Sequence, residues 1–273
     1  MRGIADVLVA GAGPAGASVA IRLARAGLRV VVVDRATFPR DKACAEYLSP
    51  ETLRHLDALG VLAALDQAGG TALTGTSVTG PGGSRLTGLF ALAGHDPFRT
   101  TGLSLPRLVL DHALVRAAQR AGAEVREGTT VTDLVYQGGA VAGAIVRSGA
   151  RTSVIHCRLV IGADGLRSVV ARLIGRRAHG RPRRMALVAH VEGVRSLVDT
   201  AEMHVGRRGY VGLNPLHAGL ANVAIVMPTN LMAPAGGRPG AFFFEALGKF
   251  PEVARRIPRD GVVRRVMVTG PFA

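Results

Sequence analysis

The sequence contains no tryptophan, and only 4% of its 273 residues are aromatic. Lysine is almost absent too, because all but Lys42 and Lys249 of the 34 basic residues are arginine. A formal net charge of +15 raises the question of a nucleic-acid partner. The arginines are scattered, however, without a run of five or six like charges and without interleaved aromatic residues. We therefore interpret the charge as a compositional preference for arginine plus some anion-binding positions.

Cysteine and long apolar runs are also scarce. The two cysteines, Cys44 and Cys157, lie far apart in the sequence, which implies no disulfide framework and fits a reducing compartment. No apolar run reaches the roughly 18 residues of a membrane-spanning helix. The apolar run after Asp6 is not read as a secretory signal, because this acidic residue interrupts its approach. We expect a cytoplasmic chain without a transmembrane segment.

Glycine, in contrast, is abundant, with 36 residues, and its N-terminal cluster is the most informative part of the chain. Residues 7–35 read VLVAGAGPAGASVAIRLARAGLRVVVVDR, which predicts a buried strand, a tight turn, a helix and a second buried strand. In this nucleotide-binding pattern Gly11 makes the turn, Gly13 lets a pyrophosphate approach the backbone, and Gly16 lets the helix pack on the strand. The helix N-terminus supplies free N–H groups to the anion. Asp34, which ends the second strand, is the expected acceptor for ribose hydroxyls.

A second turn with a ligand-binding pattern follows a later apolar strand. Residues 161–172 read IGADGLRSVVAR, so Asp164 and Gly165 stand between a strand and the start of a helix. We interpret this carboxylate as an acceptor for a ligand with several hydroxyl groups, such as the ribityl chain of FAD. Arg172, one turn beyond Ser168, is placed to hold Asp164 or an anionic group. The alternative is an ordinary Asp-Gly turn with an exposed arginine, and the first fingerprint by itself fits FAD and NAD equally.

The rest of the chain predicts a mixed α/β fold. Helical periodicity is found over 49–60 and 105–122. Apolar runs between glycine-rich turns predict short strands over 71–101 and 123–164, and long antiparallel strands over 185–228. We expect a doubly wound Rossmann-type FAD-binding domain of residues 1–72 and 102–178, interleaved with an antiparallel-sheet substrate domain of residues 73–101 and 179–273.

Four segments, in this order, carry a family resemblance: GAGPAG with Asp34, RDKACAEYLSP at 40–50, LPRLVLDHAL at 105–114, and IGADGLRSVVAR. They resemble the FAD-dependent oxidoreductases that include para-hydroxybenzoate hydroxylase-type monooxygenases, flavin-dependent halogenases and geranylgeranyl reductases. The resemblance covers nearly the whole chain and implies FAD bound in an extended form, with NADPH as a possible electron donor that meets the Asp-Gly turn transiently. The residues it implies are Gly11, Gly13, Pro14, Ala15, Gly16 and Asp34 for ADP; Arg40, Lys42, Cys44 and Ala45 along the pyrophosphate and flavin; Arg35 and Arg107 as further cofactor contacts; the backbone near Val131 at the adenine; and Asp164 with Gly165.

Two features depart from that family. Ala45 stands where the family commonly has glycine, so the backbone approaches the flavin less closely. The Gly-Asp motif and helix with which family members continue do not follow residues 269–271, so we expect the C-terminal FAD-binding segment to be missing from this chain. For the substrate pocket, Tyr210 and Pro215 keep part of a pattern of the reductases that also contains a tryptophan, and a core-packing tyrosine is the alternative. His95 is a further pocket candidate.

The first functional hypothesis is an NAD(P)H-dependent FAD monooxygenase that hydroxylates an apolar or aromatic small molecule. The alternatives are a geranylgeranyl-reductase-type reductase of prenyl double bonds, and a truncated FAD-binding fragment that turns nothing over. The flavin carries the chemistry in both enzymes, so no catalytic side chain is assigned. Cys44 is either redox-active beside the flavin or a small packing residue. No metal site is predicted, because the pair His190 and Glu192 lacks cysteines at zinc spacing.

Overall fold

The computed structural model describes residues 4–94, 96–176, 183–232 and 237–272. The chain divides into two compact units. The first unit comprises 1–40, 58–64 and 108–178, and the second comprises 41–57, 65–107 and 179–273. Both divisions of the chain, the sequence-based one and this one, end a unit at residue 178. The structural division assigns 41–57, 65–72 and 102–107, which the sequence-based division placed in the FAD-binding domain, to the unit that contains the antiparallel sheet.

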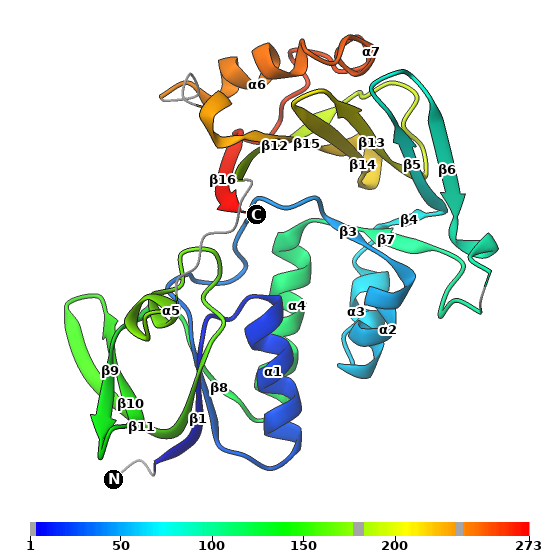
Figure 1. The fold of residues 1–273 in the computed structure, drawn as a ribbon. Helices are drawn as coiled ribbons and strands as arrows, with labels where there is room; N and C mark the ends of the chain where they lie inside the picture. The colour runs from blue at the N-terminus through cyan, green and yellow to red at the C-terminus, as the bar shows by residue number, and fades with distance from the viewer. Residues whose placement is uncertain (1–3, 95, 177–182, 233–236, 273) are drawn as a thin grey trace. The chain divides into compact units, whose positions relative to one another are not determined.

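The first unit is built on a six-stranded sheet with the order β8-β2-β1-β11-β10-β9 (Figure 1). Strands β8, β2, β1 and the second half of β11 run parallel, as buried apolar runs favour. The first half of β11 turns antiparallel to β10, so one long strand joins the two kinds of pairing. The elements are β1 (Ala5–Ala10), α1 (Pro14–Arg25), β2 (Val30–Val33), α4 (Arg107–Arg120), β8 (Glu124–Arg126), β9 (Thr129–Gln137), β10 (Ala140–Ser148), β11 (Arg151–Gly162) and α5 (Val169–Leu173).

The second unit is built on a seven-stranded sheet with the order β16-β12-β15-β14-β13-β5-β6. All of its pairs are antiparallel except β5 with β13, which run parallel. A three-stranded sheet, β3-β7-β4, accompanies it. The elements are β3 (Tyr47–Leu48), β4 (Thr71–Leu73), β5 (Gly75–Thr79), β6 (Arg85–Leu89), η1 (Phe90–Leu92), β7 (Gly102–Ser104), β12 (Arg184–Glu192), β13 (Thr200–Gly206), β14 (Gly209–Pro215), η2 (His217–Gly219), β15 (Leu220–Pro228), η3 (Thr229–Leu231), α6 (Pro239–Leu247), α7 (Pro251–Ala254) and β16 (Met267–Phe272).

Two further helices, α2 (Pro50–Ala58) and α3 (Leu62–Gln67), contain residues of both units. The hydroxyl of Ser49 accepts a hydrogen bond from the Thr52 N–H at 3.3 Å and so caps α2, and Gly60 beyond its end has a φ of +70°. The helix predicted over 49–60 is confirmed at both ends. The predicted α/β class, a parallel FAD-binding sheet together with an antiparallel sheet, is confirmed as well.

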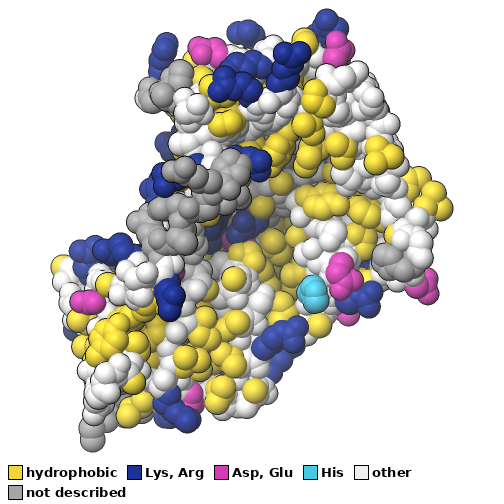
Figure 2. Space-filling view, in the orientation of Figure 1, with side chains coloured by type: hydrophobic (Ala, Val, Ile, Leu, Met, Phe, Trp, Pro, Cys, Tyr) yellow, Lys and Arg dark blue, Asp and Glu magenta, His cyan; other side chains and the backbone are white. Residues whose placement is uncertain are grey.

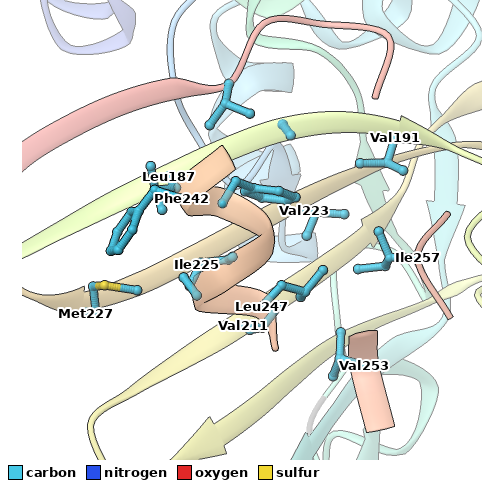
Figure 3. Close-up of a cluster of buried hydrophobic side chains, with 14 of the residues drawn as sticks. Leu187, Val191, Val211, Val223, Ile225, Met227, Phe242, Leu247, Val253 and Ile257 are labelled. Atoms are coloured by element: carbon cyan, nitrogen blue, oxygen red, sulfur yellow. The ribbon is translucent and has the colours of Figure 1, made fainter. Parts of the chain in front are cut away.

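Helices α6 and α7 pack on one face of the seven-stranded sheet (Figure 3). Side chains that alternate along β12, β14 and β15 point to this face, among them Leu187, Val211 and Ile225, and meet Phe242 and Leu247 of α6. Burial of side chains of this kind contributes about 1.5–3 kcal/mol each. The helices thus leave the other face of the sheet for different partners.

The other face is partly covered by an irregular segment, 41–47. Ala43 of this segment packs against Ala186, Val188, Ala224 and Val226 of β12 and β15. Because neighbouring residues of a strand point to opposite faces, Gly212 and Asn214 also lie on this side of the sheet. The sequence-predicted residues Lys42, Cys44 and Ala45 are therefore held on the face that the helices do not cover.

Basic side chains do not form one continuous patch on the visible face. In Figure 2 the lysine and arginine side chains stand in several separate places between hydrophobic and neutral ones. This agrees with the scattered arginines of the sequence. None of the helices in the described parts of the chain has both the length and the apolar character needed to cross a membrane.

Candidate cofactor site

The glycines of the N-terminal turn have two different structural roles. Gly11 has a φ of +100°, and a β-carbon added there would lie 2.4 Å from the carbonyl oxygen of Ala163. A β-carbon on Gly16 would lie 1.8 Å from the Gly11 carbonyl oxygen. At Gly13 the nearest atom is the Arg40 Nη2, at 3.6 Å, and φ is −69°. Gly11 and Gly16 are therefore required by packing, whereas a β-carbon on Gly13 would make only an ordinary contact with the Arg40 side chain.

The N-terminus of α1 offers donors to an anion. Gly13 is the N-cap in an extended conformation, no side chain caps the helix, and its first turn contains no acidic residue. The first N–H groups of a helix have no intrahelical partner and stand at the positive end of its dipole. In this turn Pro14 occupies the first helical position, where its missing N–H is no loss, and Ala15 follows it. The arrangement suits a pyrophosphate.

Asp34 ties the turn to the end of β2. One of its carboxylate oxygens, Oδ2, accepts a hydrogen bond from the Ala12 N–H at 2.7 Å. The other, Oδ1, accepts one from the Ala36 N–H at 2.8 Å. The sequence analysis predicts that this carboxylate binds the ribose of a nucleotide. Each of its oxygens still has a lone pair that can accept a hydrogen bond from a ribose hydroxyl group. Arg35, the next residue, is exposed.

Arg40 places a positive charge beside the turn. Its Nη1 lies 2.7 Å from the Oδ2 of Asp111, whose side chain is fully buried in α4, while the Arg40 side chain is 17% exposed. The guanidinium also lies over the ring of Phe38, with 4.9 Å between its central carbon and the ring centroid. Arg40 was predicted as a cofactor contact from the family resemblance. Its pairing with Asp111 was not predicted, because the two residues are 71 positions apart in the sequence.

The second turn meets the first one at the same sheet edge. Strands β1 and β11 run parallel with Ala10 opposite Gly162, so the loops that follow them stand at neighbouring carboxyl ends. The Ala163 N–H donates to the Ala10 carbonyl at 2.8 Å. Gly165 has a φ of +82°, a backbone conformation that favours glycine. The two glycine turns are thus brought together, as an extended dinucleotide requires.

Asp164 has a structural role that differs from the one expected. Its Oδ2 accepts hydrogen bonds from the Val169 and Val170 N–H groups at 2.6 and 3.3 Å, so the carboxylate caps α5. Ser168 caps the same helix through the Ala171 N–H at 2.9 Å. Arg172 is exposed and forms no ion pair with Asp164, to which backbone N–H groups donate instead, so of its two expected contacts only the one with an anionic group stays a prediction. The Asp164 Oδ1 is buried and has no partner within the described residues.

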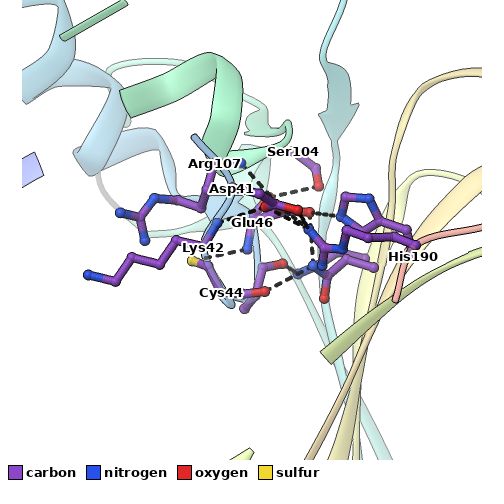
Figure 4. A network of polar contacts seen from close by, with 11 residues as sticks. Asp41, Lys42, Cys44, Glu46, Ser104, Arg107 and His190 are labelled. Atoms are coloured by element: carbon purple, nitrogen blue, oxygen red, sulfur yellow. Dashed lines mark hydrogen bonds and ion pairs between the residues drawn. The ribbon is translucent and has the colours of Figure 1, made fainter. Parts of the chain in front are cut away.

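Glu46 organises the 41–47 segment of the second unit (Figure 4). Its side chain is fully buried, and its φ of +59° is unusual for a residue other than glycine. Its Oε2 lies 2.6 Å from the His190 Nε2 and accepts a hydrogen bond from Asn222 Nδ2 at 2.8 Å. Its Oε1 accepts one from the Arg107 N–H at 3.0 Å.

The backbone of this segment is held by two asparagines. The Cys44 carbonyl accepts a hydrogen bond from Asn222 Nδ2 at 2.9 Å, and the Ala45 carbonyl accepts one from Asn214 Nδ2 at 2.5 Å. The Glu46 N–H donates to the Cys44 Sγ at 3.4 Å. Sequence reasoning missed Glu46 and both asparagines. They are polar residues without a recognisable spacing, because their contacts join positions 144 to 178 apart.

The remaining sequence-predicted residues stay predictions. Val131 is buried in β9 opposite Val146, so only its backbone is available to a ligand. Tyr210 is partly buried against the cluster that contains Val226, and Pro215 is buried at the end of β14. His95 lies outside the described residues.

Comparison with known proteins identifies the family. The sequence model of the FAD binding domain family matches residues 4–230, which is most of the chain and contains both glycine turns. The chain belongs to this family. The expected resemblance and the cofactor FAD are thereby confirmed.

Relatives in this family include named reductases. A menaquinone reductase of Mycolicibacterium smegmatis is 37% identical over an alignment of 182 positions that covers 64% of this chain and 41% of that protein. A digeranylgeranylglycerophospholipid reductase of Methanosarcina acetivorans is 29% identical over an alignment of 285 positions, gaps included, that covers 99% of this chain and 68% of that protein. A solved flavoprotein/dehydrogenase of Cytophaga hutchinsonii shares the fold, with a TM-score of 0.83, 23% identity, and coverage of 97% of this chain and 66% of that one. The chain therefore matches only part of each relative's length.

The residues of the first unit fit FAD. The space beside Gly13, the uncapped N-terminus of α1 and the positive charge of Arg40 suit the pyrophosphate. The buried Asp164 Oδ1, which has no partner in the described chain, is an acceptor for a hydroxyl group of the ligand. An unpaired buried oxygen is destabilising, so a bound hydroxyl group there removes a penalty of about 1–3 kcal/mol.

Proposed function

We propose that the chain is the FAD-binding part of a flavin-dependent reductase that reduces carbon–carbon double bonds of a polyprenyl substrate. The observation that carries this proposal is that two relatives are named for menaquinone and for a digeranylgeranyl lipid, both of which contain polyprenyl chains. They support the reductase alternative better than the monooxygenase hypothesis. Hydroxylation of an aromatic small molecule becomes the second candidate.

The first unit would hold the cofactor. The N-terminus of α1 and Arg40 bind the pyrophosphate, Asp34 orients the ribose, and Asp164 accepts from the ribityl chain. FAD, when bound, supplies hydride transfer at its ring. The protein's part is to fix the cofactor by these contacts and to exclude water from the substrate.

The helix-free face of the seven-stranded sheet supports an apolar substrate. Gly212, Met203, Val78 and Leu86 are cross-strand neighbours in that order, from β14 to β6. Val211 and Leu213 belong to the core under the helices, so this row points to the other face, on which Ala43 of the 41–47 segment also packs. Met203 and Val78 are partly exposed, and Leu86 is 76% exposed. A row without charge suits a prenyl chain better than it suits a substrate that bears an ionised group.

The test is anaerobic turnover by the purified chain loaded with FAD and reduced with dithionite. Mixing with a geranylgeranyl lipid or menaquinone should return the flavin to its oxidised spectrum and give a product heavier by two hydrogen atoms. Val78→Glu, which places a charge in the apolar row, should lower this rate at least about tenfold, because burial of a charge against hydrocarbon is unfavourable. The matched control is Val198→Glu, at a valine that is 76% exposed and outside the row.

Two results would overturn the proposal. The first is an FAD-loaded chain that leaves both prenyl substrates unchanged but consumes oxygen and NADPH with an aromatic compound, which is the outcome expected of a monooxygenase. The second is a folded chain that does not retain FAD, which is the outcome expected of a fragment without activity. Equal rates in Val78→Glu and Val198→Glu would show that the apolar row does not bind the substrate.

A further inference from the structure

A hollow of ≈ 360 Å³ lies beside α4 in the first unit. Binding sites for small molecules in proteins have volumes of about 300–1,000 Å³, so this hollow is large enough for one. Its apolar wall is formed by Pro39, Ala64, Leu108, Val109 and Ala113. Every residue that lines it belongs to the first unit, and none of them is part of the two glycine turns. The hollow is therefore a feature of one compact unit and shares no residue with the FAD turns.

The other residues that line the hollow are basic. His112, Arg116 and Arg120 follow Leu108 along α4 at intervals of four residues. Residues four apart lie on one face of a helix, so this face begins with an apolar side chain and ends with two guanidinium groups. With a rise of about 1.5 Å per residue, Arg116 stands about 12 Å beyond Leu108 along the helix axis. The hollow is thus apolar toward one end and cationic toward the other.

The cationic end has groups that a ligand can use. Arg116 and Arg120 are exposed, and in the parts of the chain that the structure describes neither forms an ion pair with a carboxylate. The Arg116 Nη1 donates to the Gln119 Oε1 at 3.1 Å, a neutral acceptor that leaves the charge of the guanidinium uncompensated. Between the two ends, the His112 Nδ1 is buried and has no hydrogen-bond partner within the described residues. These features are complementary to an anionic group that is joined to an apolar chain.

We propose that this hollow binds an amphipathic carboxylate, with its hydrocarbon chain against Leu108, Val109 and Ala113 and its carboxylate on Arg116 and Arg120. A planar guanidinium group suits this anion because it can donate two parallel hydrogen bonds to the two carboxylate oxygens. The chain would also remove apolar surface from water, since Leu108 is 39% exposed. The inference is independent of the proposed function, because the apolar row of the second unit takes no part in it.

The first experiment is calorimetric titration of the full chain, with and without FAD, with decanoate below its micelle concentration. Decanol has the same chain without the charge, and acetate has the charge without the chain. Each should bind at least about fivefold more weakly than decanoate, because each lacks one of the two kinds of contact. Added salt should weaken binding of decanoate more than that of decanol, because exposed charges are screened. Decanol that binds as tightly as decanoate, or decanoate that does not bind, would overturn the proposal.

The second experiment locates the site by substitution. The double variant Arg116→Gln, Arg120→Gln should weaken decanoate binding at least about fivefold and leave decanol binding unchanged. Ala113→Leu, which fills the hollow with a larger side chain, should weaken binding of both. The matched controls are Arg22→Gln in α1 and Ala241→Leu in α6, two exposed positions that do not line the hollow. Both controls should bind decanoate as the wild type does.

Thermal unfolding checks that the variants are folded, as expected for changes at residues that are at least partly exposed. Unchanged decanoate affinity in a folded Ala113→Leu chain would overturn the proposal, because decanoate would then bind elsewhere. FAD affinity should stay normal in the double arginine variant. A loss of FAD binding in that variant would mean that the two arginines belong to the cofactor site, and this result would overturn the proposal as well.

Discussion

The carbonyl oxygen of Ala163 lies 2.4 Å from the place where a β-carbon on Gly11 would stand. The two ligand turns of the first unit, after β1 and after β11, are therefore in direct backbone contact. Gly11 is fixed by this contact as well as by its positive φ, and a ligand that touches one turn is within reach of the other.

Gly13→Ala and Gly16→Ala should separate cofactor binding from folding. Gly13 has an ordinary φ, and an added β-carbon would make only an ordinary contact with Arg40, so alanine there should change the unfolding free energy by no more than about 0.5–1 kcal/mol. The added methyl group stands where the pyrophosphate approaches, so FAD affinity should fall at least about tenfold. Fluorescence titration with FAD and denaturant unfolding measure the two effects.

Gly16→Ala is the opposite case. Its β-carbon would stand 1.8 Å from the Gly11 carbonyl oxygen, so α1 must shift and stability should fall by about 1–3 kcal/mol or more. A Gly16→Ala chain as stable as the wild type, or a Gly13→Ala chain with normal FAD affinity, would contradict the assignment of these two glycines.

Asp164→Asn should weaken FAD binding with little effect on folding. An asparagine oxygen can still accept from the Val169 N–H, whereas the orphan acceptor Oδ1 is replaced by an amide donor. FAD affinity should fall about tenfold, in line with the loss of one hydrogen bond to a charged group. Ser168→Ala is the matched control, because it removes the other cap of α5: it should lower the unfolding free energy by about 1 kcal/mol and leave FAD affinity unchanged. The reverse pattern would mean that Asp164 is only a helix cap.

Arg40→Met should destabilise the first unit strongly. The change leaves the fully buried Asp111 carboxylate without the cation that stands 2.7 Å away, and loss of one partner of a buried pair typically costs 3–5 kcal/mol. Arg99→Met is the control, because the Arg99–Asp66 pair is 36% and 37% exposed and should contribute less than about 1 kcal/mol. Urea unfolding of the two variants checks the difference. Equal effects would show that the Asp111 carboxylate is stabilised by its other surroundings.

Ionisation of Glu202 should make the unfolding free energy of the second unit depend on pH in the acidic range. Burial by itself would raise the pKa of Glu202, but hydrogen bonds from His204 and Arg256 and the Arg256 charge lower it to about 2. Since the pKa in the folded state is below the ordinary value of 4.5, the stabilisation is complete above about pH 4.5 and is lost as the pH falls toward 2. Its size is at most about 3 kcal/mol.

The measurement is unfolding free energy against pH for the wild type and Glu202→Gln. The wild type should be the more stable at neutral pH, and the difference should shrink steadily below about pH 4.5. Glu245→Gln, at an exposed glutamate of α6, should run parallel to the wild type throughout. Parallel curves for Glu202→Gln would contradict the prediction.

Local sequence patterns were sufficient to predict the glycine turn of the first unit and the elements on either side of it. The glycine turn, α1 and the flanking strands lie within residues 5–33, so the patterns that predict them are local, although β1 also pairs with the distant strand β11. The two ends of α2 were also predicted from a local pattern, Ser49 before the helix and Gly60 after it. The Asp164–Gly165 turn was also found, but its exact contacts were not, because the sequence does not reveal that two backbone N–H groups compete with Arg172 for one carboxylate.

The second unit was less predictable for a physical reason. Glu46 was not singled out, because its importance comes from burial and from the strand positions of His190 and Asn222, which no local pattern announces. Parallel pairing of β5 with β13 joins Gly75 to Thr200 and was likewise not readable from an apparently antiparallel insert. Helices α6 and α7 were not anticipated. Cytoplasmic location stays a prediction.

The position of Glu46 also sets the order of events during synthesis. Its partners on β12 and β15 follow it by 144 and 176 residues, and contacts across such distances form late in folding. The ribosome must therefore make residues 190 and 222 before the buried carboxylate can meet these two partners. The conformation of the 41–47 segment thus depends on strands that are translated well after it.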